Sequence, residues 1–301
     1  EGKQAQYDAF WDTYQDSGNR TDYANAFYGA GWNDTTYKPK YPIISVSGAS
    51  VFANSAVTEI GRVEFLENAV LDKTFDSAKK LHTIGELALA ESCTFVAPFS
   101  NASNLANLTI SGTIGQNGFS VSGRNYLTKE SLISIINALS AATNGLTVTL
   151  EKTAVALGFN ENLFHYNTFT DLGFTKQEDG SYYGLSGIVS GKKIFVNDGS
   201  ADVVALSYHY KNTSSTSQGM RFYFVYKDGT TETHYPINKT EYTRVLRTSN
   251  SAKVLDYIVG DYGSGAVGTW LKDFEVKRLN TDTEEWANLV ATKPNWTIAL
   301  A

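Results

Sequence analysis

Tyrosine and tryptophan residues in the stretch 203–276 are the side chains best suited to binding chemistry in this sequence. The C–H face of a sugar stacks on an aromatic ring, while amides and carboxylates beside the ring take its hydroxyl groups. The sequence therefore predicts a ligand-binding platform drawn from the following residues: Tyr208, Tyr210, Tyr223, Tyr262 and Trp270. Because one face of every strand must turn towards a core, roughly half of such rings should be buried.

Paired carboxylates offer a second kind of chemistry. A glycosidase needs two carboxyl groups about 5 to 10 Å apart across the bond that it cleaves. Glu178 with Asp179, and Asp256 with Asp261, are the pairs to consider. Solvated carboxylates in turns are the favoured interpretation, so we expect no enzyme, and a carbohydrate-active enzyme remains an alternative.

Metal-binding side chains are sparse. Asp198 and Asp202 flank Gly199 and offer hard oxygen ligands of the kind that calcium accepts, although an ordinary turn is the favoured interpretation. His209 and His234 would meet if their strands paired, but two histidines on adjoining strands are a weak indication of zinc. No cofactor is expected apart from a possible calcium ion.

Two other motifs, the single cysteine and a glycine-rich segment, give little indication of function. Cys93 is the single cysteine, so no disulfide forms within the chain, and a buried small apolar side chain is the expected role. The glycine spacing of Gly263 to Gly268 matches the sequence motif of a dinucleotide-binding loop. Such a loop binds a dinucleotide only when a helix follows it. Thr269 to Val276 instead has the pattern of a strand, which favours a flexible turn.

The elements that carry the aromatic residues are short strands. Val203 to Tyr210 and Arg221 to Tyr226 are dense in aromatic and β-branched residues, and Asp228-Gly229 is a hairpin turn signal. Alternation groups Phe222 and Phe224 with Tyr226, without telling which face is exposed to solvent. Many short strands separated by Gly and Asn predict an antiparallel, jelly-roll-like β-sandwich over residues 160–280.

An internal repeat precedes these strands. Phe75 to Phe99, Leu81 to Leu105 and Ile84 to Leu108 share one spacing of 24 residues, and an earlier pass from Phe52 differs by one residue. A period in the twenties predicts a short leucine-rich-repeat solenoid over residues 43–159.

Both ends of the solenoid have recognisable elements. A helix from Thr128 and a strand over 145–150 resemble a helix over 284–293 and a strand over 295–300. About 125 residues lie between the two pairs, too many for a loop, so residues 281–301 should complete the repeat domain around an inserted domain. Tyr7, Phe10, Trp11 and Tyr14 form an aromatic stripe at helical spacing and predict a helical cap over residues 1–42.

Several blocks outside the predicted insert carry a resemblance to a known family. They are Tyr7 to Asp12, Gly31 to Asp34, Lys38 to Tyr41, Gly112 to Gly118, Leu127 to Leu139, Gly145 to Leu150 and Glu285 to Trp296. These blocks resemble leucine-rich-repeat proteins of the BspA-like type, which are found in gut Firmicutes and their phages. The predicted insert resembles carbohydrate-binding β-sandwiches only in its pattern of short strands. The resemblance implies an extracellular or virion-associated recognition protein and supplies no catalytic residue.

Charge and hydropathy narrow the function classes. The formal net charge is -6 and basic residues are scattered singly, so nucleic acid is an unexpected partner. No apolar run approaches the roughly 18 residues of a membrane-spanning helix, so no membrane insertion is expected. Together with a β-rich α+β fold, the resemblance implies a non-catalytic adhesion protein at the cell surface, binding glycan or a host surface protein. A phage tail or host-attachment component is the alternative, and the oligomeric state stays open.

Overall fold

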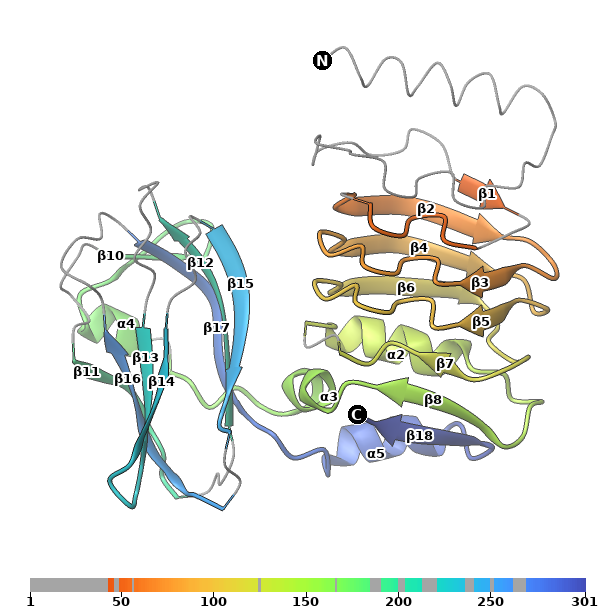
Figure 1. The fold of residues 1–301 in the computed structure, drawn as a ribbon. Coiled ribbons are helices and arrows are strands. Elements are labelled where there is room, and N and C mark those ends of the chain that lie inside the picture. The colour runs from red at the N-terminus through yellow and green to blue at the C-terminus, as the bar shows by residue number, and fades with distance from the viewer. Residues whose placement is uncertain are drawn as a thin grey trace, which may run out of the picture. The chain divides into compact units, whose positions relative to one another are not determined.

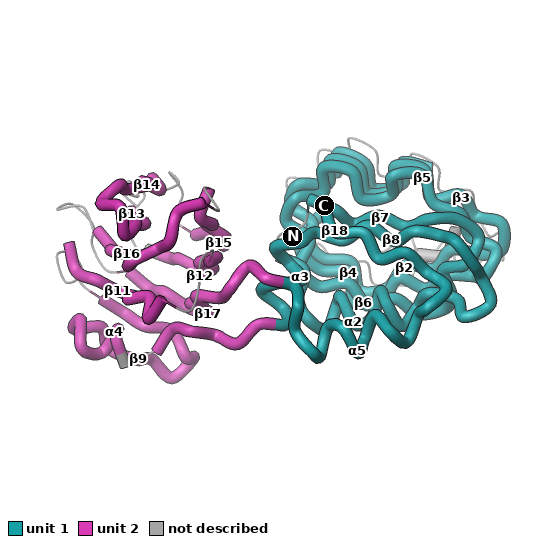
Figure 2. Tube along the Cα trace, turned by 90° about the horizontal axis from the view of Figure 1, so that it is seen from below, with its two compact units in different colours: residues 1–159, 281–301 teal, residues 160–280 magenta. Residues whose placement is uncertain are grey.

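The chain folds into β-rich α+β structure. The computed structural model describes residues 43–45 and 49–301, apart from 56, 124–125, 166, 185–190, 200–203, 213–220, 236–240, 250–251 and 262–268. The helical cap expected over residues 1–42 lies outside the described residues. Two compact units make up the chain, residues 1–159 with 281–301 (unit 1) and residues 160–280 (unit 2), as Figure 2 shows by colour.

Unit 1 is built on parallel sheets. Its 4-stranded sheet has the order β1-β2-β4-β6, with β1 at Ile43–Ser45, β2 at Glu59–Phe65, β4 at Thr83–Leu89 and β6 at Asn107–Gly112 (Figure 1). A 2-stranded parallel sheet joins β3, Val70–Asp72, to β5, Thr94–Val96. Ile60 pairs with Ile84, and Ile84 with Leu108. The 24-residue spacing seen in the sequence is therefore the register between β2 and β4 and at the start of the β4–β6 pair, which shifts by one residue further along.

Equivalent phenylalanines stack inside unit 1. The rings of Phe52 and Phe75 are 5.4 Å apart at 2° to one another, and those of Phe75 and Phe99 are 5.0 Å apart at 6°. The loops that carry them are joined by main-chain bonds, since Phe52 N donates to Thr74 O and Phe75 N to Pro98 O, both at 2.8 Å. Each ring is buried by its neighbours, so the stack depends on all three passes of the pattern.

Helices cover the later part of unit 1. Helix α2, Lys129–Ala138, begins after Thr128, whose side chain accepts a hydrogen bond from Ser131 N. This confirms the predicted helix, which buries Leu132, Ile135 and Ile136. Helix α3, Lys152–Phe159, was not predicted because it is buried on most sides and lacks a polar face that would show a helical period.

The segment after unit 2 returns to unit 1. Helix α5, Glu284–Ala291, and strand β18, Trp296–Leu300, occupy positions close to those predicted. Strand β18 pairs in parallel with β8, Leu146–Leu150, which also pairs with β7, Phe119–Ser120. Trp296 Nε1 donates to Ser140 O at 2.8 Å, and Lys293 Nζ donates to Asn137 O at 2.9 Å. These bonds satisfy carbonyls at the carboxyl end of α2, which would otherwise lack partners.

Unit 2 consists of two antiparallel sheets on a shared core. The 5-stranded sheet has the order β15-β12-β17-β10-β9, and the 4-stranded sheet has the order β11-β16-β13-β14. The elements are α4 Asn167–Asp171, β9 Thr175–Lys176, β10 Tyr182–Gly184, β11 Lys192–Val196, β12 Val204–Asn212, β13 Arg221–Tyr226, β14 Thr231–His234, β15 Glu241–Arg247, β16 Leu255–Asp261 and β17 Thr269–Arg278. The buried residues of the two sheets form one cluster, in which Phe222 and Phe274 are fully enclosed. Side chains on the opposite face of each sheet point away from this core.

The ends of unit 2 lie together. Asn160 Nδ2 donates to Asn280 O at 2.8 Å, which ties the first residue of the unit to the last. Leu163 N donates to Val276 O at 2.8 Å, so the entering segment follows β17. Such adjacent ends are what an inserted domain requires, because the chain must leave and re-enter the host unit at one place.

Candidate functional site

One row of side chains crosses all the strands of the 5-stranded sheet on its outer face. Pairing places Thr175 opposite Tyr183, Tyr183 opposite Trp270, Trp270 opposite Lys211, and Lys211 opposite Glu241. Directly paired residues of antiparallel strands point to the same face, so these five side chains form a continuous line. We call this line the cross-strand row.

The aromatic pair at the centre of the row is partly open to solvent. The rings of Tyr183 and Trp270 are 4.7 Å apart at 45°, and both residues are half-buried. Their chain neighbours Tyr182 and Leu271 are buried in the core, which leaves the alternate positions to the outer face. Two adjoining rings with exposed area are the basic requirement for stacking a flat, weakly polar ligand.

Polar groups continue the row beyond the rings. Lys211 Nζ lies 3.6 Å from Glu241 Oε2, and His209 Nε2 lies 3.1 Å from Glu241 Oε1. His209 Nδ1 is 3.0 Å from Thr243 Oγ1, which holds the imidazole from its other side. These exposed pairs contribute little to stability. They hold donors and acceptors beside the ring pair, where ligand hydroxyl groups would need them.

The turn between β9 and β10 borders the same face. Asp179 accepts hydrogen bonds from Ser181 N at 2.9 Å and Ser181 Oγ at 2.6 Å. The bond from the Ser181 side chain, with a further contribution from the charge of Lys272, lowers the pKa of Asp179 below its ordinary value. Asp179 is therefore an ionised turn carboxylate, and Lys272 lies within electrostatic reach of it.

The structure distributes the predicted aromatic residues over three environments. Trp270 lies in the cross-strand row. Tyr223 lies on the outer face of the other sheet, where its hydroxyl donates to Asp261 Oδ2 at 3.3 Å and accepts from an Arg221 nitrogen at 2.8 Å. Tyr262 lies outside the described residues. Tyr223 and Trp270 thus belong to different faces and cannot form one platform.

Tyr208 and Tyr210 are core residues, so their assignment to a ligand platform was wrong. They are 1% and 0% exposed. Tyr210 stacks on Tyr242 with ring centroids 4.9 Å apart, and Tyr208 packs on Phe222 at 5.0 Å. They share the core face of β12 with Leu206, because side chains two positions apart point the same way. The outer face of the strand carries His209 and Lys211 instead.

Tyr183 and Lys211 were missed by sequence reasoning. The turn residues Asp179-Gly180 followed by Tyr182-Tyr183 were the available signal for a short strand. Strand β10 has three residues, which is too short to display an alternation.

The two histidines considered as a zinc pair lie on different sheets. His209 lies on β12 of the 5-stranded sheet, whereas His234 lies on β14 of the 4-stranded sheet. Within the described ranges, no group of three or more His, Cys, Asp or Glu side chains is placed to hold a metal ion. Asp198 is exposed just after β11, and Asp202 lies outside the described residues, so the proposed calcium pair is not tested.

Of the two carboxylate pairs considered for a glycosidase, Asp256 with Asp261 is too widely spaced for glycoside cleavage. Glu178 and Asp179 are neighbours in the β9–β10 turn. Asp256 and Asp261 lie five positions apart on β16, a separation of about 16 Å at about 3.3 Å per residue. Glycosidases hold their two carboxyl groups roughly 5 to 10 Å apart.

The remaining motifs have structural explanations. Cys93 is buried, its Sγ donates to Leu66 O at 3.4 Å, and burial raises the pKa of its thiol. Gly263 to Gly268 lies outside the described residues, but Thr269–Arg278 is a strand, as predicted. The helix that a dinucleotide-binding loop requires is therefore not there.

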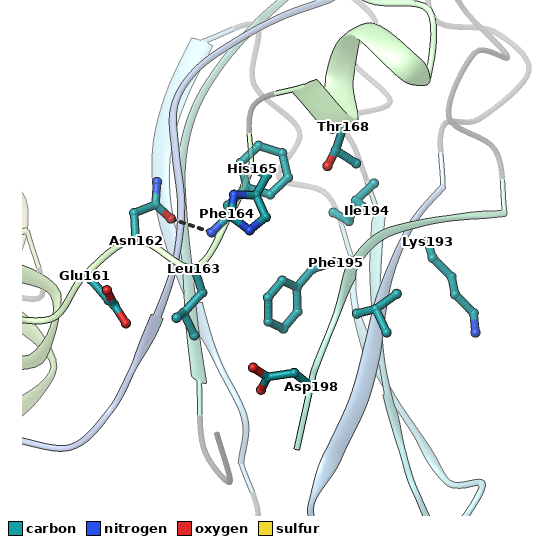
Figure 3. A pocket seen from close by; sticks show the side chains of 11 residues that line it. Glu161, Asn162, Leu163, Phe164, His165, Thr168, Lys193, Ile194, Phe195 and Asp198 are labelled. Atoms are coloured by element: carbon teal, nitrogen blue, oxygen red, sulfur yellow. Dashed lines mark hydrogen bonds between the residues drawn. The ribbon is translucent and has the colours of Figure 1, made fainter. Parts of the chain in front are cut away.

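A separate groove of about 520 Å³ lies at the side of unit 2. One wall is the segment Glu161 to His165 with Thr168, and the other is strand β11 from Lys193 onward, with Asp198. Figure 3 shows Phe195 and Leu163 facing one another across this groove, with the carboxylate of Asp198 below them. No residue of the cross-strand row lines it.

A half-buried acid–histidine cluster is expected to make the stability of unit 2 depend on pH. His234 Nε2 lies 3.2 Å from Glu232 Oε1, and Tyr226 donates to Glu232 Oε2 at 2.6 Å. Burial lowers the pKa of His234 below its ordinary value of 6.5, although the Glu232 charge opposes this. The unfolded chain therefore binds a proton near pH 6.5 that the folded chain does not bind.

The free energy of unfolding of unit 2 is accordingly expected to fall as the pH drops below about 6.5. Replacing His234 with Gln should flatten the dependence between about pH 7 and 5.5. Urea denaturation at a series of pH values measures both. An unchanged slope in the variant would show that another group governs the dependence.

Comparisons with known proteins supply no identity. No helix among the described residues is long and apolar enough to cross a membrane. No protein-family model matches the chain, and neither the curated proteins nor the solved structures include a significant match.

Proposed function

We propose that this protein is a non-catalytic recognition protein that binds glycans through the cross-strand row of unit 2. The observation that carries the proposal is the ring pair of Tyr183 and Trp270, 4.7 Å apart and partly exposed on the outer face of the sheet. A sugar ring presents a C–H face to such rings and hydroxyl groups to the polar residues beside them.

The dimensions of the row suit a glycan chain. It crosses four gaps between neighbouring strands, a length of about 19 Å at about 4.8 Å per gap. The ring pair lies at its centre, and Lys211 with Glu241 supplies donors and acceptors at one end. An open row of this kind favours an extended ligand over one that must be enclosed.

The scaffold proposed for this site has two parts. Unit 1 is proposed to be a short leucine-rich-repeat solenoid of the BspA-like type, which the 24-residue register and the stacked phenylalanines support. Unit 2 is proposed to be a jelly-roll-like sandwich inserted into it, which the two antiparallel sheets and their shared core support. Glycan recognition fits a protein at the cell surface, and it fits a phage host-attachment component equally well.

The test is glycan binding by the full chain, first on an array and then by calorimetry with the best ligand. Trp270→Ala and Tyr183→Ala are each expected to raise Kd at least about tenfold, because each removes a ring from the centre of the contact. Glycan binding on the array is measured both with calcium and with a chelator. If the chelator abolishes binding, calcium is required, and the loop that carries Asp198 becomes the candidate calcium site.

The matched control is Tyr223→Ala. It removes a tyrosine from the outer face of the other sheet and should leave Kd unchanged. Equal losses in the Tyr223 and Trp270 variants would contradict the assignment of the site. Absence of any glycan signal from the folded wild-type chain would contradict the function itself.

A further inference from the structure

Lys272 lies beside the ring pair of the cross-strand row. It follows Trp270 by two residues on β17, so both side chains belong to the outer face, about 7 Å apart along the strand. Leu271, between them, is fully buried in the core, as this alternation requires. Pairing with β12 places Lys272 directly opposite His209 and Trp270 directly opposite Lys211. The Trp270 ring therefore has one lysine along its own strand and another across the sheet.

The ammonium group of Lys272 makes no ion pair or hydrogen bond with any residue that the structure describes. Asp179 is within electrostatic reach of it, but the Oδ1 atom of Asp179 accepts both bonds from Ser181. Asp273 is the next residue, exposed at a β-bulge with φ of 52°, and it forms no ion pair with Lys272 either. The charge of Lys272 is thus available to a ligand.

The other lysine of this face already has a partner. Glu241 Oε2 lies 3.6 Å from Lys211 Nζ, and Glu241 Oε1 lies 3.1 Å from His209 Nε2. One carboxylate therefore serves both of these groups, and Lys272 is outside the arrangement. The paired positions around Trp270 carry two lysines and one carboxylate, in a chain whose formal net charge is -6. This local excess of positive charge favours a ligand with a negative charge.

The position of Lys272 suits an anionic group on a stacked sugar. A carboxylate or a sulfate ester projects from the edge of a sugar ring. When the face of that ring stacks on Trp270, such a group can extend along the strand to Lys272. Lys272 is half-buried, so water screens its charge less than that of a fully exposed lysine. A neutral sugar offers hydroxyl groups there and leaves the ammonium without a counter-ion.

We infer that the glycan bound by the cross-strand row is acidic, and that Lys272 selects its carboxylate or sulfate group. This inference rests on the proposed glycan-binding function and names the class of glycan and a residue that determines specificity. The lysine ammonium is a compact point charge that pairs with either kind of anion through charge-assisted hydrogen bonds. The two kinds of anion are therefore distinguished by experiment.

The test is an array on which carboxylated and sulfated glycans each stand beside a carboxyl-reduced or desulfated counterpart, probed with the full chain. The wild type should bind an acidic glycan at least about tenfold more tightly than its neutral counterpart. The set that binds, carboxylated or sulfated, identifies the anion. Lys272→Gln should remove this preference, and Lys272→Arg should retain it because the positive charge is kept.

The matched control is Lys192→Gln, which removes the same charge from an exposed position on β11 of the other sheet and should leave Kd unchanged. Raising the ionic strength should weaken acidic-glycan binding by the wild type more than by Lys272→Gln. These measurements separate a binding charge from a structural role of the side chain.

Two results would overturn the inference while the proposed function stands. One is equal affinity for acidic glycans and their neutral counterparts, with binding still lost in Trp270→Ala. The other is an acidic preference that persists in Lys272→Gln. Absence of binding to every glycan, acidic and neutral, would instead contradict the proposed function, and the inference would fall with it.

Discussion

Replacing Phe75 with Ala is expected to lower the free energy of unfolding of unit 1 by about 3 to 5 kcal/mol. Phe75 is 0% exposed and lies between Phe52 and Phe99, with ring centroids 5.4 Å and 5.0 Å away. Removing the middle ring opens a cavity that both neighbours line. The main-chain bonds on either side hold the loops at their spacing, so the cavity cannot close easily.

Denaturant-dependent hydrogen exchange measures this loss separately in the two units. Amides of β4 should exchange faster in the variant, while amides of β12 in unit 2 keep their protection. Phe75→Leu is the matched control and should cost less, since it retains most of the buried volume. Equal losses for Ala and Leu, or equal acceleration in β12, would contradict a role confined to the stack in unit 1.

Replacing Trp296 with Ala is expected to cost unit 1 a similar amount, about 3 to 5 kcal/mol. The Trp296 side chain is 7% exposed and belongs to the same core cluster as Leu139 and Val148. Its Nε1 also donates to Ser140 O at 2.8 Å, so the variant leaves a buried carbonyl without its partner. The segment that follows unit 2 would then be held to β8 by main-chain pairing without this anchor.

Trp296→Phe separates packing from hydrogen bonding. It keeps an aromatic ring in the core and removes the N–H donor, so it should cost about 1 to 3 kcal/mol. Chemical denaturation of both variants gives the difference, and exchange of the β8 amides shows where it acts. A loss below about 1 kcal/mol for Trp296→Ala would mean that unit 1 does not depend on the returning segment.

Some elements were predictable because their information is local. The helix after Thr128 was predicted from a capping residue and an apolar period, and the structure places α2 there with that cap. Strand β17 was predicted from alternation, and the spacing of 24 residues reappears as strand register. These patterns depend on residues near one another in sequence, or repeated at one distance, so no tertiary information is needed to see them.

The composition of the cross-strand row, the proposed glycan site, could not be predicted in this way. The cross-strand row takes one residue from each strand of a sheet whose order is β15-β12-β17-β10-β9. That order depends on long-range pairing between segments up to roughly a hundred residues apart, which no local pattern encodes. Tyr183 was missed for this reason, because it belongs to the row only through its pairing with Trp270 on another strand.

By itself the sequence determined the longer strands, the helices with an apolar period, and which side chains alternate along them, but not helix α3 or the short strand β10. Whether a given face is core or surface was decided by tertiary structure alone. Tyr208, Tyr210 and Tyr183 all lie on strands of the same sheet, yet the first two tyrosines are buried and Tyr183 is partly exposed. A tyrosine suits either face, because it has an apolar ring and a polar hydroxyl group. The choice therefore follows from which sheet packs against which, and that is a property of the whole unit.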